Sequence, residues 1–152
     1  MVQKNLLSLL LVVVMALACS AGRARAENGL TVTGSIAFMD LLKKNSDEVS
    51  YLQLIPVSPA GKVGMHIVKG KLLFKSDLPK FPIPADGKFR LEMGPLKPGR
   101  YLLAAQMLTA GSQYTALALR APKVTAEVII PPDAKFPLTV NLGQVAFPIR
   151  RK

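Results

Sequence analysis

The sequence predicts an all-β fold, an antiparallel β-sandwich of seven to eight short strands. Apolar and polar residues alternate with a period of two along most of the chain, which is the pattern of strands that bury one face. Turns containing Gly or Pro separate these runs at short intervals, as they do in sandwich domains. No segment after residue 26 shows a convincing helical period, an internal repeat or a low-complexity linker.

The most regular alternation lies in residues 88–93, which follow a tight turn. Asp86 and Gly87 form this turn, because glycine adopts positive φ without a Cβ clash. In the strand that follows, apolar side chains are expected to be buried and charged ones to face water. The two sets are Phe89, Leu91 and Met93 against Lys88, Arg90 and Glu92.

A Pro-Gly turn and a tyrosine come next and form a predicted structural corner. Pro98 restricts φ, and Gly99 supplies a left-handed bend that lets the chain cross between sheets. Tyr101 is expected to bury its ring and to bond the backbone through its hydroxyl, as tyrosine corners do. We therefore interpret all three residues as structural and assign no catalytic role to Tyr101.

The N-terminal half is predicted to hold three further strands. The first covers residues 30–38, and five residues share its buried face: Leu30, Val32, Gly34, Ile36 and Phe38. Residues 39–48 form a polar connection with one helical turn at most, and residues 49–57 form the second strand. Residues 66–74 are predicted as one uninterrupted third strand with Gly70 as a bulge. Three prolines make residues 77–85 an extended or edge segment.

The C-terminal part continues the strand pattern. Residues 114–119 are a candidate strand, and the next strand places four residues on one buried face: Val124, Ala126, Val128 and Ile130. Pro131 and Pro132 end that strand. The closing strand alternates through Leu138, Val140 and Leu142, and it continues beyond Gly143 to Val145 and Phe147.

Several of these motifs together resemble a known group. Asp86-Gly87-x-Phe89-x-Leu91, followed by Leu96-x-Pro98-Gly99-x-Tyr101-x-Leu103-x-Ala105, resembles the hallmark of carboxypeptidase-regulatory-like (transthyretin-like, prealbumin-like) domains. Val32-x-Gly34-x-Ile36 and Leu138-x-Val140-x-Leu142-Gly143-x-Val145 are similar to the first and last strands of that group. The resemblance covers residues 30–147 and implies a Greek-key sandwich. Residues 39–48 replace the family's usual Gly-x-Pro segment, so the strand order stays open.

The residue inventory speaks against an enzyme. His66 is the chain's only histidine, and we expect it to be a half-buried strand residue on the same face as Val68, Leu72 and Phe74. The sequence contains no nucleophile elbow and no cluster with zinc or calcium spacing. Transthyretin-like hydrolases, the enzymatic branch that the resemblance implies, use more than one histidine and a C-terminal Tyr-Arg-Gly-Ser, which this chain lacks. We predict no catalytic residue, no cofactor and no metal site.

The first 26 residues are predicted to be a secretory signal peptide. Their apolar run, Leu6 to Ala18, is shorter than the ~20 residues that a membrane span needs. Cleavage after Ala26 would leave residues 27–152 as one β-domain. The alternative is processing before Cys19, because Met15 to Cys19 resembles a relaxed bacterial lipobox and a lipidated Cys19 would anchor the domain. The protein is then periplasmic or extracellular, or an outer-membrane lipoprotein.

The charge is strongly basic. The formal net charge is +11, and loss of residues 1–26 with their three basic residues leaves +8. The basic groups are Lys43 and Lys44, Lys69 and Lys71, Lys97 and Arg100, and Arg150, Arg151 and Lys152. Outside the cytoplasm such groups point to an anionic surface, such as lipid headgroups or an acidic polymer, and not to nucleic acid. Scattered lysines also keep a β-rich protein soluble, and we favour that interpretation because no aromatic residues interleave with them.

The predicted function is that of a non-catalytic, exported binding or structural module in the bacterial cell envelope, with an envelope protein or an anionic surface as partner. A carbohydrate- or anionic-polymer-binding module is the alternative, and a transthyretin-like hydrolase is the third class. Carbohydrate binding would require Tyr51 and Tyr114 to be exposed on one sheet face, because the chain has no Trp. Membrane contact is expected only through a lipid anchor at Cys19.

Overall fold

The computed structural model describes residues 28–44, 50–109 and 112–148. These residues are mostly β-strand, as an all-β fold requires, and the single helix among them is the short α2, Met39–Lys44. No helix in the described part of the chain is long and apolar enough to span a membrane. The predicted signal peptide, its cleavage site at Ala26 and the alternative site at Cys19 lie outside the described residues.

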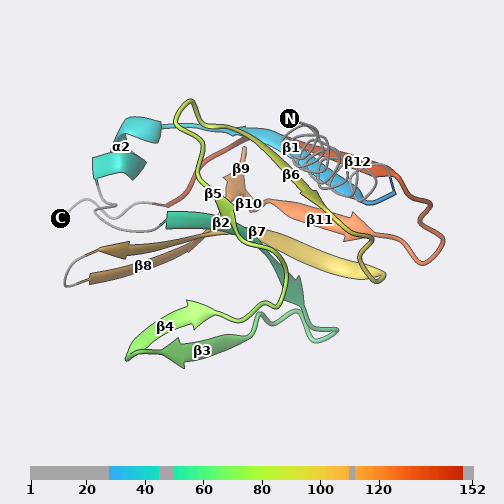
Figure 1. Cartoon of the computed structure of the whole chain (residues 1–152), viewed down its shortest axis with the longest axis horizontal. Helices are drawn as coiled ribbons and strands as arrows, with labels where there is room; N and C mark the ends of the chain where they lie inside the picture. The colour runs from blue at the N-terminus through green and yellow to red at the C-terminus, as the bar shows by residue number, and fades with distance from the viewer. Residues whose placement is uncertain (1–27, 45–49, 110–111, 149–152) are drawn as a thin grey trace, which may run out of the picture.

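One of the two larger sheets has three strands (Figure 1). In spatial order they are β12 (Leu138–Val145), β1 (Leu30–Ile36) and β6 (Lys88–Met93). β1 pairs antiparallel with β6 but parallel with β12, which departs from the wholly antiparallel arrangement predicted. The register of β1 against β12 shifts between Thr33 and Ser35, where Gly143 has a positive φ of 65°. Only glycine adopts this conformation without cost, so Gly143 allows the irregularity.

The other larger sheet has five strands and is built around β7 (Gly99–Thr109). β2 (Ser50–Val57) pairs along one edge of β7, and β5 (Phe81–Pro82) follows β2. β8 (Ser112–Leu117) and β11 (Glu127–Ile130) both pair with the opposite edge, β8 with residues 104–109 and β11 with residues 99–102. Two strands therefore share one edge of β7, end to end.

The segment between β8 and β11 leaves this sheet opposite Leu103 of β7. Leu103 accepts a hydrogen bond from Ala118 N (2.8 Å) and donates one to Ala126 O (3.3 Å). Between these two alanines the chain forms a small hairpin of β9 (Leu119–Arg120) and β10 (Val124–Thr125). Leu119 then exchanges two backbone hydrogen bonds with Ala146, just beyond β12. The β9–β10 hairpin thus ties the five-stranded sheet to the end of the three-stranded sheet.

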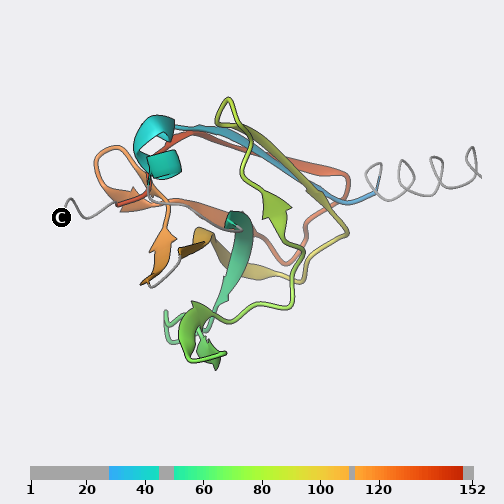
Figure 2. The same ribbon diagram turned by 60° about the vertical axis from the view of Figure 1, so that its left-hand side comes forward.

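The main hydrophobic core receives side chains from both larger sheets, which lie as two layers in Figure 2. The predicted alternation of β6 is confirmed: its burial changes at every residue from exposed Lys88 to buried Met93. Leu103 and Val128 are fully buried in the same cluster, and Val140 is partly buried against it. Two predicted core residues are wrong, because Phe38 and Val124 are 66% and 60% exposed. Phe38 lies beyond the end of β1, and Val124 belongs to the hairpin that has left the sheet.

The predicted third strand is also wrong, because residues 65–74 form a hairpin. β3 (Met65–Val68) and β4 (Lys71–Phe74) pair antiparallel around Lys69 and Gly70. Both turn residues have positive φ, 49° and 74°, as a two-residue type I′ turn requires. The register places His66 opposite Leu73, so His66 shares a face with Leu73 and Val68 and not with Leu72 and Phe74.

Two buried glutamines attach this hairpin to the outer face of the five-stranded sheet. Gln106 of β7 accepts a hydrogen bond from Phe74 N (3.0 Å) and donates one to Phe74 O (3.1 Å), so its amide replaces a strand partner. Gln53 of β2 donates to Ser76 O (3.2 Å) and Leu78 O (2.7 Å). Phe74 packs beside Ile55 and Ala104 in a second, smaller core. The outer face of this sheet is therefore covered over β2 and β7, whereas Ile129 on β11 stays exposed.

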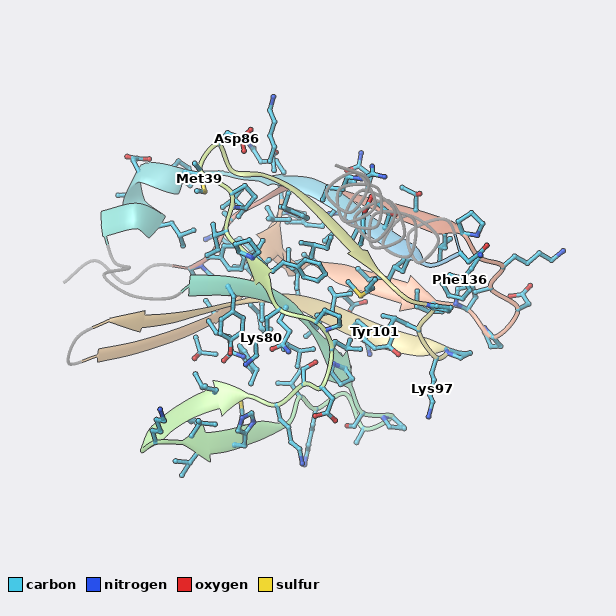
Figure 3. All side chains as sticks on the ribbon, viewed as in Figure 1. Met39, Lys80, Asp86, Lys97, Tyr101 and Phe136 are labelled. Carbon is cyan, nitrogen blue, oxygen red and sulfur yellow. The ribbon has the colours of Figure 1, made fainter. Side chains whose placement is uncertain are left out.

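The turn before β7 is fastened by Tyr101 (Figure 3). Its ring is buried, and its hydroxyl donates a 2.8 Å hydrogen bond to the carbonyl of Lys97, the kind of backbone bond that a tyrosine corner makes. Burial raises the pKa of the Tyr101 phenol above its ordinary value. The neighbouring Arg100 forms an ion pair with Glu127, and this hydrogen-bonded contact raises the pKa of Arg100.

We expect Tyr101→Phe to lower the free energy of unfolding by about 1 kcal/mol at pH 7, because it removes one internal hydrogen bond. The folded-state pKa of Tyr101 lies above the unfolded-state value, so the stability linked to this group is present below about pH 10 and is lost as the pH rises through the raised value. The difference in free energy of unfolding between the wild type and Tyr101→Phe should therefore be smaller at pH 11 than at pH 7. Urea unfolding at both pH values measures it, and an unchanged stability at pH 7 would contradict the structural role.

Candidate functional site

An open groove of about 820 Å³ lies where the β9–β10 hairpin meets the end of β12. Val145 and Phe147 are buried beneath it, and the two backbone bonds between Leu119 and Ala146 fix one side. The other side is the chain that follows β1, held by a 2.7 Å hydrogen bond from Ala37 N to Val145 O. Three segments that are distant in the sequence thus build the groove, and backbone pairing positions each of them.

The lining is apolar with a basic rim. The twelve described residues around the groove are Ala37, Phe38, Leu119, Arg120, Ala121, Pro122, Lys123, Gln144, Val145, Ala146, Phe147 and Pro148. Arg120 and Lys123 carry the only charges among them, and both are exposed. A ligand that fits this lining has an apolar body and an acidic group, since pockets combine apolar walls with a few polar groups that orient the ligand.

Phe38 is held against local preference at the edge of this groove. Its φ is 59°, a left-handed conformation that costs a bulky residue roughly 1–2 kcal/mol. The residue is 66% exposed, so burial in the core does not offset that cost. Its carbonyl accepts hydrogen bonds from Leu41 N (3.0 Å) and Leu42 N (3.2 Å), which starts α2. Residues with a strained backbone are concentrated at functional sites, and Phe38 is therefore a candidate ligand contact.

The groove contains none of the acid–base or nucleophilic groups discussed for the sequence. His66 lies on β3, half-buried, and its Nδ1 atom has no hydrogen-bond partner among the described residues. Pro98, Gly99 and Tyr101 form the turn into β7 and do not line the groove. Within residues 28–44, 50–109 and 112–148, no three His, Cys, Asp or Glu side chains are grouped as metal ligands are.

The predicted basic groups have different surroundings. Arg100 forms an ion pair with Glu127, and the backbone carbonyl of Lys97 accepts a hydrogen bond from the Tyr101 hydroxyl. Lys69 lies in the turn of the β3–β4 hairpin, and residues 150–152 lie outside the described part. Tyr51 carries the ammonium of Lys80 over its ring, 4.8 Å from the centroid, so this face of the ring is not free for a sugar. The side chain of Tyr114 lies outside the described residues.

Sequence reasoning missed Arg120, Lys123 and Phe38 as a group. Phe38 was predicted to be in the core, and Arg120 and Lys123 were not among the predicted basic groups. The one available signal was the sequence Leu119 to Lys123, where Ala-Pro between two basic residues indicates a turn with both charges nearby.

Comparison with known proteins adds no assignment: no protein-family model, no curated protein and no solved structure matches the chain.

We expect Phe38→Asn to raise the free energy of unfolding by about 1 kcal/mol, because asparagine tolerates the left-handed conformation better than phenylalanine. Chemical denaturation measures the change. Phe38→Leu is the control, since it keeps the strained backbone and an apolar side chain and should not gain stability. A clear loss of stability in Phe38→Asn would show that the ring supports the fold and would remove it as a candidate ligand contact.

Proposed function

We propose that this protein is an exported, non-catalytic binding module of the bacterial cell envelope whose groove takes an amphipathic ligand with an acidic group. The fold that we propose for it is a Greek-key β-sandwich of the carboxypeptidase-regulatory-like, or transthyretin-like, type. The arrangement of a three-stranded and a five-stranded sheet around one core supports this proposal. So does the corner formed by Tyr101 and the carbonyl of Lys97.

The observation that carries the function is the pairing of apolar walls with two unopposed cations. No Asp or Glu is among the twelve described residues that line the groove, so Arg120 and Lys123 face a ligand without an internal counter-ion there. The same lining includes no Ser, Thr, Cys, His or Tyr. The lining therefore supports binding, and it contains no pair of a nucleophile and a base, since Lys123 is the one residue of either kind among the twelve.

Titration of the purified exported protein with a fluorescent long-chain fatty acid tests this function. We expect saturable binding that weakens roughly tenfold in the double variant Arg120→Ala, Lys123→Ala, because each exposed charge contributes up to about 1 kcal/mol. Gln144→Trp should also weaken binding, since Gln144 is an exposed strand residue whose enlargement would obstruct the groove. Phe38→Asn should bind less tightly than Phe38→Leu.

The matched control is Lys88→Ala with Lys135→Ala, which removes two exposed basic residues that do not line the groove. Equal weakening in the control would show that net charge, and not the groove, attracts the ligand. A fatty alcohol of the same chain length separates the apolar from the acidic contribution. Tighter binding of the alcohol than of the acid would overturn the proposed role of the basic rim.

Export is supported by the N-terminal sequence, and the form of the exported protein decides how it meets its ligand. We expect the intact mass of the protein recovered from a bacterial envelope to correspond to a chain that begins at Glu27. A mass that includes a diacylglyceryl group on Cys19 would assign the lipoprotein form instead. Recovery of the whole chain from Met1 in the cytoplasm would contradict export in either form.

A further inference from the structure

The β3–β4 hairpin and its flanks, residues 62–75, are called the arm below. Figures 1 and 2 both show this hairpin outside the two layers of the body. Seven large hydrophobic residues are exposed in the described part of the chain, and four of them lie on the arm: Met65, Ile67, Val68 and Leu72. Ile67 is the most exposed of all seven, at 73%. An exposed apolar group of this kind marks an interaction surface.

The arm is also purely basic. From residue 49 to residue 76 the sequence contains no Asp or Glu, whereas it contains Lys62, Lys69, Lys71 and Lys75. Lys69 occupies the turn itself, next to the exposed Val68. Exposed apolar side chains in a segment whose charged residues are all lysines fit an interface that is apolar inside and anionic outside.

The base of the arm is rigidly attached, although its tip is exposed. The backbone N–H and carbonyl of Phe74 both form hydrogen bonds with the side-chain amide of the buried Gln106. Lys75 N donates a 2.9 Å hydrogen bond to Gly64 O. Thr115 of β8 donates a hydrogen bond to Leu72 O at 3.4 Å. These contacts fix the base of the arm on the five-stranded sheet, and this attachment lowers the entropic cost of binding through the tip.

We propose that the arm inserts its tip into the interface of a membrane that carries anionic headgroups. Ile67 and Leu72 face one side of the hairpin, and Val68 faces the other, because directly opposed residues share a face. A protein groove would cover one of these faces, whereas a lipid interface surrounds the tip and buries both. Pairing with the arm of a second copy would bring together two segments that each carry four lysines and no acidic residue, which is unfavourable. This inference does not rest on the groove.

Cosedimentation with lipid vesicles tests the proposal, using the exported protein with Cys19→Ala so that no acyl chain of its own contributes. Vesicles of phosphatidylcholine with one quarter phosphatidylglycerol supply the anionic surface, and pure phosphatidylcholine is the neutral comparison. We expect binding to the anionic vesicles that falls steeply between low and physiological salt. Ile67→Ser should reduce that binding roughly tenfold, since it removes apolar surface from the tip.

Ile129→Ser is the matched control for Ile67→Ser, because Ile129 is an isoleucine on a strand and is 59% exposed away from the arm. Lys69→Asn tests the charge alone, since Asn-Gly suits a type I′ turn and should keep the hairpin intact. It should weaken anionic binding about fivefold, whereas Lys88→Asn should not. Thermal unfolding of each variant verifies that the fold is retained.

Equal binding of Ile67→Ser and Ile129→Ser would overturn the proposal, and so would equal binding to anionic and neutral vesicles. Loss of vesicle binding in Arg120→Ala, Lys123→Ala but not in the arm variants would assign the membrane contact to the groove. Absence of vesicle binding with Ile67-dependent dimers, or with Ile67-dependent capture of an acidic envelope protein, would assign the arm to a protein partner. Failure of the fatty-acid titration alone would leave the arm unaffected.

Discussion

The fold depends on the pairing of β7 along both of its edges and the use of both of its faces. Leu103 and Ala105 point into the main core, whereas Ala104 and Gln106 point to the opposite face and hold the arm. At Leu103 the neighbouring strand divides, and the β9–β10 hairpin crosses to the end of β12. The β9–β10 hairpin, which forms one side of the groove, therefore leaves the sheet beside one edge of β7, and the arm is held on the outer face of the same strand.

Local patterns predicted the strands that have one buried face and missed those that do not. Residues 88–93 alternate in sequence and in burial, because one side of β6 faces the core and the other faces water. Lys69 and Gly70 were interpreted as strand and bulge, although a residue followed by Gly between two apolar runs also fits a type I′ turn. The backbone angles of both residues show the turn. Phe38 continues an alternating pattern past the end of β1, and Val124 precedes β11 in a separate short strand, β10, so periodicity alone assigned both wrongly to the core.

The groove and the arm's attachment lay beyond such reasoning for a different reason. The groove joins residues 37–38, 119–123 and 144–148, and no local pattern indicates that these segments meet. Gln53 and Gln106 are polar residues within strands, yet each is 1% exposed, because the arm and the residues that follow it cover them. A buried glutamine is favourable only when its amide is fully paired, and the partner atoms belong to backbone 20 or more residues away in sequence.

The distribution of charge argues for binding more strongly than its total does. Two ion pairs form within the described residues, Arg90 with Glu92 and Arg100 with Glu127. All four residues lie outside the arm and outside the groove lining. The arm and the groove lining contain no acidic residue, and each combines its cations with exposed or accessible apolar side chains. Lysines that serve solubility alone have no reason to gather where apolar surface is also exposed, because that surface itself promotes association. The excess positive charge is thus placed where an amphipathic anion or an anionic interface would meet it, and this placement is the physical basis for assigning both surfaces to binding.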